Sequence, residues 1–287
     1  MGAAFKSLRQ SAHIGRHSIV TAVLVSFALV VAVVTLMVLT AIGRVADYSN
    51  KLDDERSWET TVGALKTFQG QLEATLHDHS ARNDAARHVY GTDNQGWIVG
   101  NYGDISSNGA LFDTAVIVDD DNKPVIAYHD GQPMTENIED VLGTAVWALV
   151  DQARTTRITG VPEASGYIMT RDGIAAAGAA TIRERSGRIP VPEGHRRYLI
   201  LVRYLDAARI KMLSNTYVIS GLTLVPPDTV ALHAVSIVDP LGKSLGRLMW
   251  SSRQPGDMSY QQVRPLVLGA LGLVGLFFVV LLILGSL

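Results

Sequence analysis

Residues 18–42 read SIVTAVLVSFALVVAVVTLMVLTAI, and no charged side chain interrupts them. A second uncharged run, PLVLGALGLVGLFFVVLLILGSL, occupies residues 265–287. A helix rises about 1.5 Å per residue, so either run is long enough to cross about 30 Å of hydrocarbon. We therefore predict two transmembrane helices, with residues 43–264 between them on one side of the membrane.

A cleaved signal peptide is the alternative interpretation of the first run. The apolar region of a signal peptide extends over roughly 7–15 residues, and a small-x-small cleavage motif follows it. The run here is longer, and no such motif follows Ile42. The pattern therefore favours a membrane span.

The charges around the first span do not orient the chain. Cytoplasmic flanks carry an excess of Lys and Arg, whereas acidic residues count little. Three basic residues lie on either side of the first run, Lys6, Arg9 and Arg16 before it and Arg44, Lys51 and Arg56 after it. At the other end, the chain stops at Leu287 inside an apolar run without a basic flank, which predicts a longer full-length protein.

The composition excludes several classes of function. The chain contains no cysteine, so it has neither a disulfide framework nor thiolate chemistry. The formal net charge of −2 argues against a nucleic-acid-binding surface. The sequence contains no nucleophile elbow, phosphate-binding glycine loop or zinc-protease motif, so we predict no enzyme activity for these residues and no cofactor.

Residues 44–90 are predicted to form one long helix after the first span. The apolar residues Trp58, Val62, Leu65, Leu72 and Leu76 follow a spacing of three to four, and Gln69 interrupts the pattern. A stripe this narrow fits either a seam between two paired helices or one helix packed along its own domain. The first alternative predicts a homodimer through residues 44–80 and the spans.

The rest of the middle region, residues 91–250, reads as an α+β core. Residues 91–109 predict a loop with a helical turn at 97–102, and residues 111–118 and 124–128 predict a β-hairpin. A helix is expected at 135–157. Strands are expected at 167–170, 174–182, 198–204, 222–225, 230–238 and 244–250. A strand pair, helices and then three strands is the order of a PAS-like sensory fold, with helices over one face of a sheet.

The order of five segments carries a family resemblance. These are HDHSARNDAARHVY (77–90), WIVGNYGDIS (97–106), LFDTAVIVDDDNKPVIAY (111–128), YLILVRYLDAARI (198–210) and LGRLMWSSRQPG (245–256). Over most of residues 44–264 the chain resembles the fourth CHASE family of extracytoplasmic sensory domains. His77, Asp78, Asp84 and Ala85 match the family's helix end, where SARN at 80–83 replaces the usual tryptophans, and Trp250, Pro255, Gly256 and Pro265 match its terminal pattern.

The resemblance implies a PAS/Cache-like periplasmic sensor in a bacterial inner membrane. Residues 1–17 would then be a cytoplasmic tail, and residues 43–264 would receive an unknown small-molecule or protein signal. The output would be a cytoplasmic GGDEF and/or EAL domain that makes or degrades cyclic diguanylate. The sensor half of a histidine kinase or chemoreceptor, and a ligand-free dimerisation or partner-binding module, are the alternatives.

Candidate ligand-binding residues follow from the PAS-like fold, whose sensors bind ligands between the sheet and its helices. An arginine within an apolar strand either faces solvent or is available to bind a carboxylate or phosphate. Arg203 is such a residue, in the strand expected at 198–204. The predicted lining consists of Trp97, Tyr102, Phe112, Tyr128, Tyr167, Arg203 and Tyr204.

The polar segment 77–90 permits three interpretations. Asp84 and His88 share a helix face, so they could form an exposed pair. Asp78 and Asp84 could instead turn inward and tie the helix to the loop at Asn101 and Tyr102. A metal site of His77, Asp84 and His88 would need a distant ligand such as His129 or His233, and we predict no metal.

Overall fold

The computed structural model describes residues 3–91, 95–107, 109–155, 163–186, 191 and 194–286 of the 287-residue chain. The chain divides into two compact units. Unit 1 combines Met1–Glu55 with Ser252–Leu287, and unit 2 is Arg56–Ser251. Helix α1, Ala3–Ser80, contributes residues to both units.

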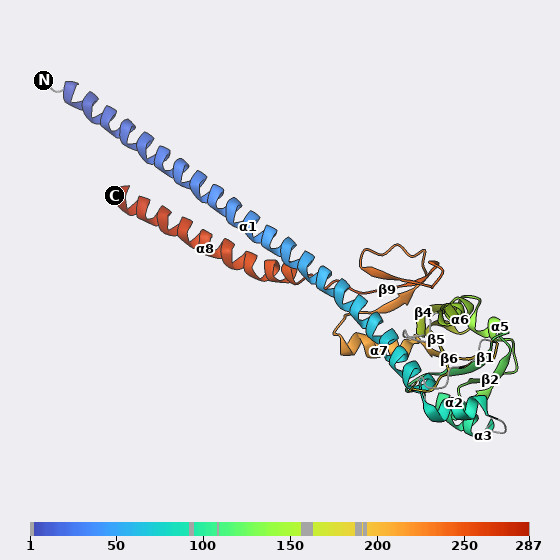
Figure 1. Ribbon diagram of the computed structural model, residues 1–287. Helices are drawn as coiled ribbons and strands as arrows, with labels where there is room; N and C mark the ends of the chain where they lie inside the picture. Colours follow the sequence, from blue (N-terminus) through green and yellow to red (C-terminus); the bar gives the residue numbers. More distant parts are fainter. Residues whose placement is uncertain are drawn as a thin grey trace. The chain divides into compact units, whose positions relative to one another are not determined.

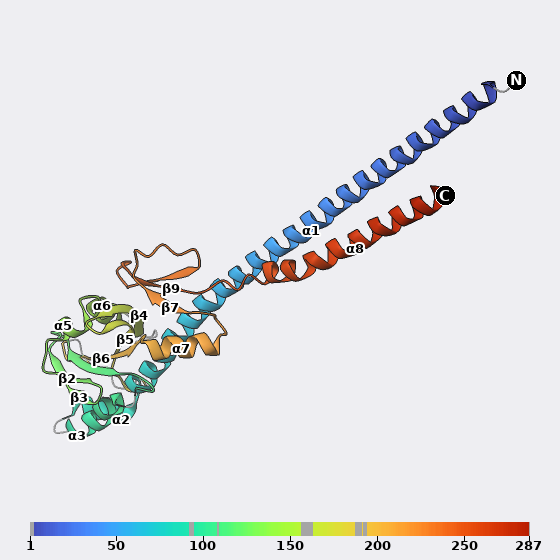
Figure 2. The ribbon, with the colours of Figure 1, turned by 180° about the vertical axis from the view of Figure 1, so that it is seen from behind.

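Unit 1 is a pair of helices. The first part of α1 lies beside α8, Pro255–Ser286 (Figures 1 and 2). The rings of Phe27 and Phe278 stack with their centroids 3.5 Å apart. At the start of α8 the backbone N–H of Gly256 donates to Oδ1 of Asn50 at 2.8 Å, and a Cβ atom on Gly256 would overlap the backbone of Ala46. A glycine at this position therefore lets the two backbones approach closely.

Both helices of unit 1 are long and apolar enough to cross a membrane. The most apolar stretch of 18 residues has a mean hydropathy of 3.0 within Thr21–Ser80 and of 2.2 within Pro255–Leu281. Neither stretch is buried in the structure. Large side chains such as Leu36 and Leu266 are 67% and 72% exposed. These helices contain the two uncharged runs predicted to be spans.

Unit 2 is built around a six-stranded antiparallel sheet with the order β3-β2-β1-β6-β5-β4 (Figures 1 and 2). The strands are β1 Thr114–Asp119, β2 Pro124–His129, β3 Gln132–Pro133, β4 Glu163–Thr170, β5 Gly173–Thr181 and β6 Arg197–Tyr204. The predicted hairpin is confirmed, with Thr114 paired to His129. The three later strands are confirmed as well, and β4 starts four residues earlier than expected.

Strand β5 carries small side chains because helices pack on both of its faces. Its sequence is GIAAAGAAT, and its middle residues are fully buried. Ala176 and Ala180 belong to the hydrophobic cluster that includes residues of α1. Ala175 belongs to a second hydrophobic cluster, which includes residues of α6. A Cβ atom at Gly178 would lie 2.8 Å from Cδ2 of Leu76 on α1. The expectation of helices over one face only is therefore wrong, since both faces of the sheet are covered.

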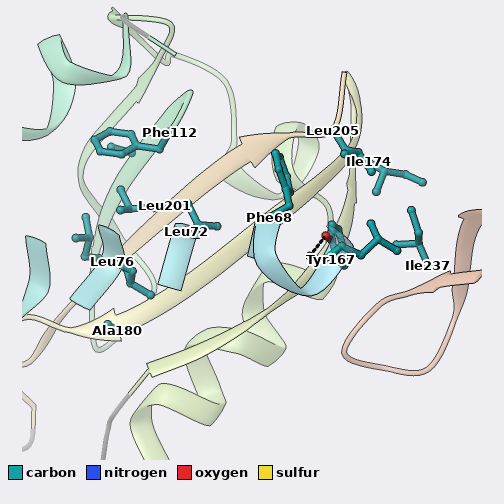
Figure 3. Packing of buried hydrophobic residues seen from close by; sticks show 14 of the residues in the cluster. Phe68, Leu72, Leu76, Phe112, Tyr167, Ile174, Ala180, Leu201, Leu205 and Ile237 are labelled. Carbon is teal, nitrogen blue, oxygen red and sulfur yellow. Dashed lines mark hydrogen bonds between the residues drawn. The ribbon is translucent and has the colours of Figure 1, made fainter. Parts of the chain in front are cut away.

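The second half of α1 supplies one of these layers. Phe68, Leu72 and Leu76 are at most 1% exposed and belong to the same buried cluster as Leu201 (Figure 3). Gln69, which interrupts the apolar spacing, donates from Nε2 to Oγ of Ser165 on the edge strand β4 at 2.6 Å. The leucine stripe thus packs along the helix's own domain.

Helices α5, Ile138–Leu142, and α6, Ala145–Thr155, cover the other face. One helix was expected over 135–157, but it is divided at Gly143. Gly143 has φ +78°, in the left-handed region that favours glycine, and a Cβ atom there would lie 2.5 Å from the carbonyl oxygen of Met169. The break at Gly143 therefore divides the expected helix into α5 and α6.

The segments that connect α1 to β1 are short helices. They are α2 Asn83–Tyr90, α3 Gln95–Ile98, a π-helical turn Val99–Gly103 and α4 Asp104–Ser106. The helical turn expected at 97–102 is confirmed and is longer than predicted. The long helix expected over 44–90 is two helices, α1 and α2.

A smaller sheet completes unit 2. After β6, helix α7 spans Ala207–Thr216, and its start is capped by Asp206, which accepts from the N–H of Arg209. The strands β7 Thr223–Val225, β8 Ala234–Val238 and β9 Ser244–Met249 then form a sheet with the order β7-β9-β8. The strand expected at 230–238 is shorter and begins at Ala234.

Candidate functional site

The junction between α1 and α2 is fixed by a strand-like contact. Ala81 forms an isolated parallel bridge with Arg183, whose backbone N–H donates to the carbonyl oxygen of Ser80 at 2.9 Å. Arg82 then has extended backbone angles, φ −130° and ψ 140°. A chain segment that follows β5 therefore ends α1 and sets the direction in which α2 leaves it.

A cavity of about 630 Å³ lies beside α2, and we call it the α2 cavity. One wall comes from α2, and the others come from the end of β1 and from the segment that leads into β6. Its described lining residues are Asn83, Ala86, Arg87, Tyr90, Asp119, Glu184, Val191, Gly194, His195, Arg196 and Arg197.

Tyr90 and Arg197 join α2 to the start of β6. The Tyr90 hydroxyl donates to the carbonyl oxygen of Ile182 at 2.8 Å and accepts from the N–H of Arg197 at 3.0 Å. Nη1 of Arg197 donates to the carbonyl oxygen of Val89. Burial raises the pKa of Tyr90 to about 12, so its hydroxyl stays protonated at neutral pH.

The β1–β2 turn holds a second wall in place. Asp120 accepts from the hydroxyl of Tyr198 and from the backbone N–H of Arg196, each at 2.8 Å. Asp119 pairs with Arg197 in the ladder between β1 and β6. Because Asp120 is hydrogen-bonded to both Tyr198 and Arg196, the fold itself holds this wall in place.

The described lining of the cavity combines charged and apolar groups. It contains arginine, histidine, carboxylate and apolar side chains. The described lining therefore provides charged and apolar contacts for a ligand.

A family model described as the CHASE4 domain matches residues 64–225, which is more than half of the chain. The chain belongs to the CHASE4 family. CHASE4 domains are extracellular sensory domains and are not catalytic. No curated protein matches the chain.

The match to the CHASE4 domain runs from Ala64 in α1 to Val225 at the end of β7. It therefore contains every described residue of the α2 cavity, whereas β8 and β9 lie beyond it. The matched range, residues 64–225, is shorter than the range 44–264 over which the resemblance was expected. Residues 64–225 are therefore a sensory region.

Two acidic residues of the CHASE4 domain do not take the inward position proposed for them. Both carboxylate oxygens of Asp84 accept from Arg82, from Nε at 3.0 Å and from Nη2 at 2.5 Å. This pairing is the main reason why the pKa of Asp84 is lowered. The side chain of Asp78 is 71% exposed and lies 3.7 Å from Nη2 of Arg185. The expected tie through these carboxylates is wrong, because both have arginine partners at the surface.

The tie between the helix end and the core runs through a tyrosine instead. The hydroxyl of Tyr102 donates to the backbone carbonyl of His79 at 2.9 Å, and Tyr102 is only 1% exposed. The His79 ring meets Phe112 edge-on, with centroids 5.6 Å apart. Burial raises the pKa of Tyr102 and lowers that of His79, so both groups favour their neutral forms.

Trp97 lies against α2. Its ring stacks on His88 with centroids 4.6 Å apart and an interplanar angle of 13°. Asn101 donates to the carbonyl oxygen of Trp97 at 2.9 Å, within its own helical segment and not to Asp84. Trp97 and His88 therefore hold α2 against the helices that follow it.

The remaining predicted ligand residues lie in the core or beside it. Tyr167 donates its hydroxyl to the carbonyl oxygen of Leu65 at 2.9 Å. Arg203 lies over the ring of Phe68, 4.8 Å from its centroid, and desolvation lowers the pKa of Arg203. Tyr204 meets His129 edge-on, and Tyr128 packs against Gly103. None of the seven predicted lining residues is among the described lining of the α2 cavity, and a ligand role for them stays a prediction.

His77 and His129 each have a separate partner. Nδ1 of His77 lies 2.5 Å from Oε1 of Glu163, and Nδ1 of His129 lies 2.8 Å from the hydroxyl of Thr114. No group of three or more histidine, cysteine, aspartate or glutamate residues suited to a metal is found in the part of the chain that the structure describes. His77 instead connects α1 to the edge strand β4.

The α2 cavity was not predicted from the sequence. The segment 77–90 was recognised as polar and unusual, and it contributes the α2 wall. The opposite wall includes GHRR at 194–197, which follows the similarly basic segment RERSGR at 183–188. This concentration of arginines before β6 was the available signal.

Proposed function

We propose that the chain is the sensor module of a membrane receptor, anchored by residues 18–42 and 265–287, with its CHASE4 domain in the periplasm of a bacterium. The observation that carries this proposal is a CHASE4 match at residues 64–225, between two uncharged runs, each within a helix long and apolar enough to cross a membrane. Two crossings return the chain to its starting side, so both ends would lie in the cytoplasm.

A PAS/Cache-like fold is part of the proposal. In its favour, the strand pair β1–β2 and the later strands β4–β6 form one antiparallel sheet in which β1 pairs with β6. The α5 and α6 helices connect the two groups of strands. Sensors of this kind change state when a ligand favours one arrangement of the covering elements over another.

The continuity of α1 supports a route for the signal. The helix has no interruption between Ala3 and Ser80, and α2, a wall of the α2 cavity, begins at Asn83. A ligand that shifts α2 would act on the end of α1 through the bridge at Ala81. The shift is limited by the ligand's difference in affinity for the two states.

For the output, we propose a cytoplasmic GGDEF and/or EAL domain. The sensor half of a histidine kinase or chemoreceptor would have the same extracellular part. Deletion of the natural gene separates these alternatives, because only the first changes cellular cyclic diguanylate directly. An unchanged level of this messenger would exclude a diguanylate cyclase or phosphodiesterase output.

The orientation can be tested with single cysteines, because residues 1–287 contain none. Asp121→Cys places a thiol on the β1–β2 turn, where the side chain of Asp121 is 74% exposed. We expect a membrane-impermeant maleimide to label Asp121→Cys in cells whose outer membrane is permeabilised. Ser11→Cys, in the N-terminal tail, should be labelled only after the inner membrane is opened. The reverse pattern would contradict the proposed topology.

We also propose that the receptor is a homodimer. Because Leu65, Leu72 and Leu76 pack against their own sheet, the contact would use other side chains of α1 and the spans. Val45 and Tyr48 are candidates, since they are 67% and 69% exposed.

Disulfide crosslinking tests this contact. Tyr48→Cys is expected to form a covalent dimer under mild oxidation in membranes, because it would lie near its own copy in the partner. Asp47→Cys is the matched control, as Asp47 is also exposed but points about 100° away on a helix. Equal crosslinking of both variants would indicate random collision, and crosslinking of neither would contradict a dimer through this face.

A further inference from the structure

We propose that the α2 cavity binds an organic carboxylate that carries an apolar body. The inference rests on the proposed sensor function, and it names the chemical class of the signal.

The described lining carries an excess of positive charge. It contains Arg87, Arg196 and Arg197 against Asp119 and Glu184. A concave surface with a net charge of one sign concentrates ligands of the opposite sign. The excess therefore favours an anion.

Arg87 is the arginine available to the ligand. It is exposed on α2, and its side chain has no hydrogen bond or ion pair with the other described residues. The guanidinium of Arg197, in contrast, binds the carbonyl oxygen of Val89. A guanidinium presents paired donors that match the two oxygens of a carboxylate.

The two acids of the lining already serve local turns. Oδ1 of Asp119 accepts from the backbone N–H groups of Asp121 at 2.9 Å and Lys123 at 2.8 Å. Oε2 of Glu184 accepts from the hydroxyl of Ser186 at 2.7 Å. These bonds hold the carboxylates to their own segments, so the cavity is better suited to an anion than to an ammonium ion.

The remaining surface suits an apolar body. Both hydrogen-bonding roles of the Tyr90 hydroxyl are taken by Ile182 and Arg197, so Tyr90 offers the ligand its ring. Ala86 and Val191 add aliphatic surface. At about 630 Å³ the cavity is within the range of about 300–1,000 Å³ typical of small-molecule sites.

The test compares a carboxylate with its neutral amide. The full 287-residue chain in lipid nanodiscs is titrated with 3-phenylpropanoate and with 3-phenylpropanamide, and the heat of binding is measured. We expect the carboxylate to bind at least about tenfold more tightly, because a charge-assisted hydrogen bond is lost with the amide. Arg87→Gln should remove this preference and leave the amide's affinity unchanged.

Arg185→Gln is the matched control. Arg185 is 70% exposed and lies near Asp78, but it is not among the described lining of the cavity. Its loss lowers the positive charge near α2 by the same amount and should leave the carboxylate preference intact. Equal affinity for both probes, binding of neither probe, or equal losses in Arg87→Gln and Arg185→Gln would each overturn the inference. Periplasmic labelling of Asp121→Cys would stand in each case, so failure of the ligand class is distinguishable from failure of the sensor topology.

Discussion

Replacement of Asp113 by alanine is expected to lower the unfolding temperature of the CHASE4 domain by about 10 °C. Asp113 is only 6% exposed, and its two oxygens lie 2.6 and 2.7 Å from Nη1 and Nη2 of Arg209. Removal of one member of a buried ion pair costs about 3–5 kcal/mol, because the other charge loses its partner. Arg209 would keep only the longer contact to Asp206, at 3.7 Å, among the described acidic residues. A domain of this size loses about 2–4 °C for each kcal/mol.

The surrounding hydrogen bonds explain why the loss should extend beyond one pair. Asp113 precedes β1 and accepts from the backbone N–H of Tyr204, at the end of β6, at 2.8 Å. The guanidinium of Arg209, on α7, donates to the carbonyl oxygens of Tyr204 at 2.9 Å and Gly109 at 2.5 Å. One ion pair thus connects two central strands, a helix and a loop.

Thermal unfolding of the full chain in nanodiscs, followed by circular dichroism, measures the effect. Asp121→Ala is the control, because Asp121 is 74% exposed and its ion pair with Lys123 is worth at most about 1 kcal/mol. Asp113→Asn retains one acceptor oxygen, so its loss should lie between the two. A similar unfolding temperature for Asp113→Ala and Asp121→Ala would contradict a structural role for the buried pair.

The strands could be predicted because their signals are local. In the hairpin β1–β2 two β-branched runs flank the turn DDDNK, and that turn fixes the pairing of Thr114 with His129. Strand β5 was recognised in the same way. Its unusually small side chains also held information about packing on both faces, as the close approach of Leu76 to Gly178 shows.

The end of α1 could not be predicted, because distant residues determine it. The segment HSAR at 79–82 contains neither glycine nor proline, and helix continues through such residues unless a tertiary contact prevents it. The contact comes from Arg183, about a hundred residues later in the chain. Gly143, by contrast, was a local signal for the break between α5 and α6.

The same reason explains the limits of the site prediction. Aromatic residues were selected as ligand candidates by type, yet Tyr102 and Tyr167 use their hydroxyls to satisfy backbone carbonyls within the core. The α2 cavity depends on bringing α2 beside the start of β6. The pairing of β1 with β6, the bridge at Ala81 and the hydrogen bonds between Arg197 and α2 place these segments together.

Leu72→Ala is expected to destabilise the domain by about 2–5 kcal/mol, whereas Trp58→Ala should cost much less. Both residues belong to the apolar stripe on α1 that permitted two interpretations. Leu72 is fully buried in the cluster between α1 and the sheet, so its truncation leaves a cavity. Trp58 is 51% exposed and has little packing to lose within its own chain.

Comparison of Leu72→Ala with Trp58→Ala also shows whether the apolar stripe serves the domain core or the contact between two chains. If the stripe is a core face, Leu72→Ala lowers the unfolding temperature equally at low and high protein concentration, because the lost contacts lie within one chain. If the stripe is a pairing seam, both substitutions weaken the dimer, and the loss shrinks as the concentration rises. Thermal unfolding across a hundredfold range of protein concentration in detergent distinguishes these results. A Trp58→Ala variant as unstable as Leu72→Ala would overturn the assignment of this face to the domain core.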